Sequence, residues 1–90
     1  MRETHIVVKD VQGYTFYEVK ATGSAKSCIR DAMGQLMEYA YWPGRKNASK
    51  IVIVGEEEMD LKTANYLRFL RENFDLPIRY ESIAIDKQDA

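Results

Sequence analysis

Hydrophobic and polar positions change their spacing along the chain, and each spacing predicts a different element. Residues 5–9 (HIVVK) and 14–20 (YTFYEVK) are rich in β-branched and aromatic residues, which predicts two strands. The turn-forming segment 10–13 (DVQG) joins them, so we expect an antiparallel hairpin. Between residues 25 and 41 the apolar positions recur at helical spacing, and Pro43-Gly44 ends that helix.

The second half of the chain adds a strand, a helix and a final strand. Residues 51–54 (IVIV) form an unbroken β-branched run, which is typical of a strand buried on both faces. Residues 61–74 carry a helical apolar stripe with Asp60 available as the cap. Pro77 precedes the last strand, which covers residues 78–80 and extends at most to residue 85.

The order β-β-α-β-α-β predicts an α/β fold. A hairpin followed by two right-handed crossovers gives a mixed sheet with helices packed on it. We therefore expect strand 51–54 in the interior of the sheet, parallel to strand 14–20.

Composition predicts the number of domains, the assembly and the cellular location. Ninety residues with 46% hydrophobic and 30% charged content predict one globular domain, residues 1–90. So small a core favours a homodimer or a larger parent protein. No apolar run reaches the roughly 20 residues that span a bilayer, so no membrane partner is expected. The lone Cys28 excludes an internal disulfide framework and a cysteine zinc cluster, and these features together favour the cytoplasm.

The distribution of charge permits nucleic-acid binding without requiring it. The formal net charge is −1, whereas proteins that bind nucleic acid unaided usually carry a basic excess that neutralises phosphates. Basic residues gather locally instead. The candidates for contact with nucleic acid are Lys26, Arg30, Arg45 and Lys46.

The most specific chemistry lies in strand 14–20, where Glu18 and Lys20 are two residues apart and point to the same sheet face. A carboxylate can hold Mg²⁺ together with its waters. The metal would lower the pKa of one water, which could then attack a phosphodiester. Lys20 would orient or deprotonate that water, or stabilise the developing charge. Alone, a Glu-x-Lys triplet is common, and the simpler interpretation is an exposed pair on a solvated strand face.

The following helix supplies two further polar side chains. Gln35 and Tyr39 lie four residues apart, hence on one face of the helix. The small residues Cys28 and Ala32 would let this helix approach the sheet closely. The amide of Gln35 and the hydroxyl of Tyr39 could then reach the carboxylate, a bound water or a phosphate.

Taken together, Glu18-x-Lys20 in a hairpin and Gln35-x-x-x-Tyr39 on the next helix resemble the PD-(D/E)xK nuclease superfamily. The similarity is to its RecB-like branch, which has a QxxxY helix, and it covers residues 5–55. The resemblance implies a restriction-endonuclease-like core without its leading helix and first strand. It implies phosphodiester hydrolysis on DNA with Mg²⁺ or Mn²⁺, with Glu18 as metal ligand, Lys20 as catalytic lysine, and supporting roles for Gln35 and Tyr39.

The sequence departs from the family at a second metal ligand. Where the family has an Asp at the start of the preceding strand, this chain has His5, whose neutral imidazole suits Mn²⁺, iron or Zn²⁺ better than Mg²⁺. Asp10 is the alternative ligand, but it sits at the turn. With a loop at Gln12-Gly13, His5 would face Lys20 and Asp10 would point away from Glu18, and another loop would change this register.

Two functional hypotheses follow. The first is a divalent-metal-dependent DNA nuclease domain, excised or truncated and incomplete or inactive alone. The second is a non-catalytic, dimeric module that binds nucleic acid or protein on the same scaffold. The intact Glu-x-Lys and QxxxY patterns favour descent from the first, whereas the missing Asp, the incomplete core and the mildly acidic charge favour the second.

Overall fold

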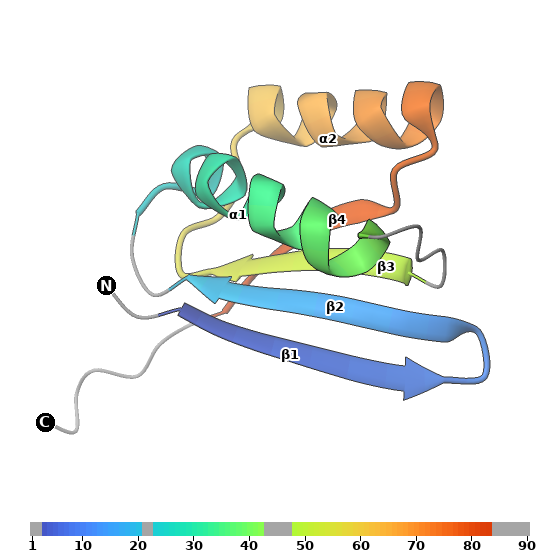
Figure 1. Ribbon diagram of the computed structural model, residues 1–90. Coiled ribbons are helices and arrows are strands. Elements are labelled where there is room, and N and C mark those ends of the chain that lie inside the picture. Colours follow the sequence, from blue (N-terminus) through green and yellow to red (C-terminus); the bar gives the residue numbers. More distant parts are fainter. Residues whose placement is uncertain (1–2, 21–22, 43–47, 84–90) are drawn as a thin grey trace, which may run out of the picture.

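The computed structural model describes residues 3–20, 23–42 and 48–83, and it has the predicted order of elements (Figure 1). The elements are β1 (Glu3–Asp10), β2 (Gly13–Lys20), α1 (Ala25–Tyr41), β3 (Ala48–Gly55), α2 (Leu61–Phe74) and β4 (Ile78–Ser82). The chain is therefore a small α/β protein, as the sequence predicts.

The four strands form one mixed sheet in the order β1-β2-β3-β4. Strands β1 and β2 are antiparallel, whereas β2, β3 and β4 run parallel to one another. Strand β3 lies in the interior and pairs in parallel with β2, so the prediction for residues 51–54 is confirmed. Both crossovers step in the same direction across the sheet, which places α1 and α2 over the same face (Figure 1).

The hairpin turn differs from the loop considered from the sequence. Asp10 pairs with Gly13, so the loop is Val11-Gln12 and not Gln12-Gly13. The Oδ1 atom of Asp10 accepts a hydrogen bond from the backbone N–H of Gln12 at 2.8 Å. Gly13 has a φ of 131°, a backbone conformation that residues other than glycine rarely adopt. These two local features shift the register by two residues, and a shift of two keeps every side chain on its face.

The core lies between the sheet and the two helices. Helix α1 packs on β2 and β3, and α2 packs on β4. Each helix begins at a capping side chain, Ser24 for α1 and Asp60 for α2. Cys28 and Ala32 are buried against the sheet, as expected of small residues that allow close approach. The buried core residues are Phe16, Cys28, Ile29, Ala32, Leu36, Ala40, Ile51, Ile53, Leu67 and Ile78.

Strand β1 is the least covered part of the sheet. It forms one edge, and in the described part of the chain it is paired only with β2. Its apolar residues Ile6, Val7 and Val8 are 45%, 54% and 45% exposed. Within the described residues, no helix is both long enough and apolar enough to cross a membrane.

Candidate functional site

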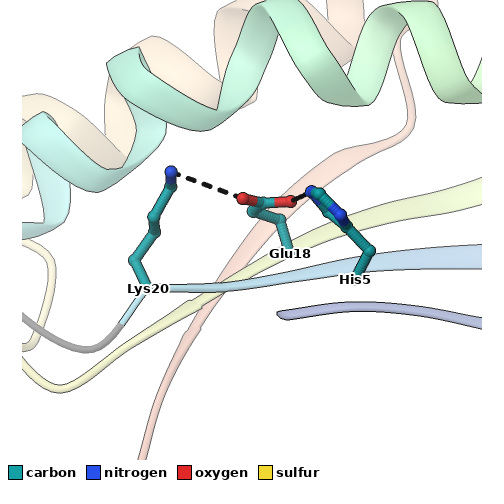
Figure 2. Close-up of polar contacts among 3 residues, drawn as sticks. All are labelled: His5, Glu18 and Lys20. Atoms are coloured by element: carbon teal, nitrogen blue, oxygen red, sulfur yellow. Dashed lines mark ion pairs between the residues drawn. The ribbon is translucent and has the colours of Figure 1, made fainter. Parts of the chain in front are cut away.

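Three ionisable side chains meet between the hairpin and α1, as Figure 2 shows. Glu18 and Lys20 point from β2 towards the helices, on one face as predicted. His5 joins them from β1, where it pairs with Glu18 in the register and not with Lys20. One oxygen of Glu18 contacts the Nε2 atom of His5, and the other lies 3.3 Å from the Nζ atom of Lys20. We call His5, Glu18 and Lys20 the hairpin cluster.

Burial distinguishes this cluster from an ordinary surface ion pair. The side chain of Glu18 is 0% exposed and that of Lys20 is 3% exposed, whereas His5 keeps 33% of its side chain exposed. The interpretation of Glu18 and Lys20 as a solvated strand pair is therefore wrong. A charge removed from water is costly unless a partner compensates it. Lys20 places a positive charge beside one carboxylate oxygen, and the imidazole of His5 contacts the other.

The two helix residues of the QxxxY pattern are placed differently. The ring of Tyr39 meets the ring of His5 edge-on, with 4.7 Å between centroids and 75° between planes. Gln35 is exposed and makes no hydrogen bond to a described residue. The difference follows from helix phase, because Leu36 and Ala40 face the core. Tyr39 is long enough to reach beyond that buried stripe to β1, and Gln35 points to solvent.

Asp10 does not join the cluster. It lies at the turn end of the hairpin and on the opposite sheet face from Glu18, as its pairing with Gly13 requires. One oxygen of its carboxylate accepts the hydrogen bond from the backbone N–H of Gln12. The turn therefore uses the carboxylate that was a candidate metal ligand.

The hairpin cluster does not fit Mg²⁺. His5 and Glu18 offer one nitrogen and one carboxylate, and the described residues contain no group of three or more His, Cys, Asp or Glu side chains that could hold a metal ion. Mg²⁺ keeps several waters when it binds protein, but the Glu18 carboxylate is enclosed and Lys20 lies against it. A cation with its water shell would have to displace Lys20 and open the helix–sheet contact.

The candidate nucleic-acid contacts fall into two groups. Lys26 and Arg30 are exposed on α1, where they line a groove shared with α2. Arg45 and Lys46 lie outside the described residues. The sequence-based interpretation missed Lys62 and Tyr66, which line the same groove from α2. Their four-residue spacing puts them on one helix face, but only the arrangement of the two helices brings that face to Lys26.

A second polar cluster lies at the carboxyl ends of the parallel strands. Burial raises the pKa of the Cys28 thiol, although the charge of Lys20 acts in the opposite direction. Burial likewise raises the pKa of Tyr80, whose hydroxyl donates a hydrogen bond to the Glu57 carbonyl at 2.6 Å. A Cβ atom at Gly55 would run into the Tyr80 phenol, so glycine makes room for this ring.

Comparison of the chain with models of protein families, with curated proteins and with solved structures finds no match. The resemblance to the nuclease superfamily therefore stays a hypothesis that rests on the residues of the hairpin and α1.

Proposed function

We propose that this chain is a non-catalytic interaction module that pairs with a second copy of itself through β1. The observation that carries the proposal is the complete burial of the Glu18 carboxylate between His5 and Lys20. A metal-dependent nuclease needs its carboxylate open to a metal and to a phosphate. Here the carboxylate instead anchors the edge strand to the body of the domain.

The anchoring role follows from where the three side chains originate. His5 belongs to β1, and Glu18 and Lys20 belong to β2 under α1. Because the buried carboxylate of Glu18 contacts His5 across the hairpin, a side-chain contact as well as backbone hydrogen bonds joins β1 to β2. An edge strand held in this way is a rigid surface for a partner.

The surface itself favours a second strand as partner. An edge strand presents unpaired backbone N–H and C=O groups, and proteins usually shield such edges with charges, bulges or short strands. Strand β1 is eight residues long, and Ile6, Val7 and Val8 are about half exposed. A second copy can pair with it in an antiparallel manner about a twofold axis. The four strands of each copy then form one continuous sheet.

Light scattering tests the pairing, with Val7→Lys as the disruptive variant and Val11→Lys as the matched control. Val7 lies in the middle of β1, whereas Val11 is fully exposed in the turn, so both substitutions add one charge at an exposed valine. We expect wild type and Val11→Lys to be dimers at high micromolar concentration and Val7→Lys to be a monomer. A monomeric wild type, or equal behaviour of the two variants, would contradict the proposal.

A metal-dependent DNA nuclease is the second candidate function. One observation favours it: Glu18 and Lys20 lie side by side on one sheet face with His5 adjoining, close to the arrangement that the resemblance implies. Incubation with Mg²⁺ or Mn²⁺ and single- or double-stranded DNA separates the candidates. We expect no cleavage above a blank. Metal-dependent cleavage that is lost in Glu18→Gln would establish the nuclease instead. In either case we propose a cytoplasmic protein, in keeping with a single cysteine that forms no internal disulfide.

A further inference from the structure

The groove between α1 and α2 has a volume of about 510 Å³, which lies within the range of small-molecule sites. It is separate from the hairpin cluster and from β1. Helix α1 contributes Lys26, Ile29, Arg30 and Met33, and α2 with its cap contributes Asp60, Lys62, Thr63 and Tyr66. The groove has an apolar floor, one aromatic wall and a cationic rim.

The cations of the rim are not neutralised by ion pairs within the described part of the chain. Lys26, Arg30 and Lys62 make no ion pair or side-chain hydrogen bond with any described residue. Asp60 is the one carboxylate among the lining residues, and it already accepts a hydrogen bond from the Thr63 amide at 2.8 Å. Hydrogen bonding by Thr63, followed by the charges of Lys62 and Lys26, lowers the pKa of Asp60. The two lysines, on different helices, thus both stabilise the charged form of Asp60. With three cations and one carboxylate, the rim has a net positive charge.

The positions of the lysines are unfavourable for stability. Lys26 is the second residue of α1 and Lys62 is the second residue of α2. The amino-terminal end of a helix carries partial positive charge, so cations there destabilise the helix and anions stabilise it. An anion bound in the groove would relieve this repulsion at both helices.

The floor and wall complement a flat apolar group. Ile29 and Thr63 are buried at the base, and the ring of Tyr66 is 50% exposed. Planar bases stack on aromatic side chains with little dependence on sequence. We infer that the groove binds a nucleotide unit, with phosphate against Lys26, Arg30 and Lys62 and the base against Tyr66. This inference goes beyond the proposed dimer and does not depend on it.

The unit can belong to a free nucleotide or to single-stranded DNA, and two probes distinguish these sources. Adenosine monophosphate is titrated calorimetrically, and a fluorescein-labelled oligothymidylate is followed by anisotropy, both at about 50 mM salt, where phosphate contacts are strong. Saturable binding of both probes indicates a site for the nucleotide itself. Binding of the oligonucleotide alone indicates a site for a strand.

The decisive comparison is between two double variants with the same change of charge. The groove variant is Lys26→Gln with Arg30→Gln, and the control is Lys50→Gln with Arg79→Gln, at exposed strand positions outside the groove. We expect the groove variant to weaken oligonucleotide binding by about tenfold. The slope of log K against log salt concentration should become less steep by about 0.7 for each lost phosphate contact. The control should bind like wild type. Circular dichroism verifies that all variants remain folded.

Tyr66→Leu tests the aromatic wall separately from the charges. Leucine preserves the apolar surface and removes the stacking, so affinity should fall by about fivefold or more with an unchanged salt dependence. Equal losses in the groove and control variants, or no binding of either probe at millimolar nucleotide, would overturn the inference. Because dimerisation is measured by light scattering, either result leaves the proposed function standing.

Discussion

The hairpin cluster and the α1–α2 groove both place cations on the helix-covered side of the sheet, but these cations differ in their exposure to solvent. In the cluster, Glu18 and Lys20 are enclosed and directly paired. In the groove, Lys26 and Lys62 are exposed and make no ion pair with a described residue. The contrast shows that chemically similar side chains can serve different purposes within one small domain.

The physical difference is where the compensation for each charge comes from. A buried ion has lost its hydration, so it depends on its protein partner. An exposed cation keeps its hydration and can exchange water for an anionic ligand at little cost. We therefore expect substitutions in the hairpin cluster to change the free energy of unfolding, and substitutions in the groove to change binding.

The largest expected effect comes from removing one partner of the buried pair. Glu18→Ala removes the carboxylate that lies 3.3 Å from the Nζ atom of Lys20, whose side chain is 3% exposed. Loss of one partner of a buried pair typically costs about 3–5 kcal/mol. Urea denaturation should show this loss in the free energy of unfolding. A cost below about 1 kcal/mol, the usual value of a surface pair, would remove the distinction between the two regions.

Replacing both partners should cost much less than replacing either one. Lys20→Met alone leaves the Glu18 carboxylate enclosed, whereas Glu18→Met with Lys20→Met removes both charges and fills a similar volume. Such double replacements are often neutral or stabilising, so we expect unfolding free energy within about 1 kcal/mol of wild type. Wild type, the two single variants Glu18→Met and Lys20→Met, and the double variant form a double-mutant cycle. Additive costs would mean that the two side chains do not depend on each other.

The fold was predictable because its signals are local. The periodicity of apolar residues and the stops at their ends gave both helices the bounds that the structure has, Ala25–Tyr41 and Leu61–Phe74. Strand β3 is longer than the apolar run 51–54, because its pairing with β2 extends it back to Ala48. Pairing between strands is a long-range effect that no local pattern contains.

The site was predictable only in part, for a related reason. Strand alternation placed Glu18 and Lys20 on one face. Their burial could not be read from the sequence, because it depends on how closely α1 packs over β2. The partner of Glu18 depends on the turn, where Asp10 and Gly13 select the loop and so bring His5 opposite the carboxylate.

The groove shows the limit of sequence patterns most clearly. Lys26 and Arg30 were visible as part of a basic segment, but Lys62 and Tyr66 were not linked to them. These residues are more than thirty positions apart along the chain. Only the parallel placement of α1 and α2 over one sheet face brings them to the same cavity.

The smallest expected effect concerns the two lysines at the starts of the helices. Lys26→Gln and Lys62→Gln each remove a cation from the positive end of a helix dipole, and glutamine has nearly the helix propensity of lysine. Each substitution should therefore raise the free energy of unfolding by about 0.3–1 kcal/mol at low ionic strength. The gain should shrink as salt is added, because exposed charges are screened.

Lys50→Gln is the matched control for this prediction, since Lys50 is an exposed lysine on a strand, away from any helix end. Its unfolding free energy should stay within about 0.5 kcal/mol of wild type. Urea denaturation at low and high salt measures all three variants. A loss of stability in Lys26→Gln or Lys62→Gln would mean that the lysine stabilises its own helix. The lysines of the groove would then stabilise the fold, as the charged side chains of the hairpin cluster do. A small, salt-sensitive rise in the free energy of unfolding would instead show that these lysines reduce stability at their positions. Such a cost to stability is expected of side chains whose role is to bind a ligand.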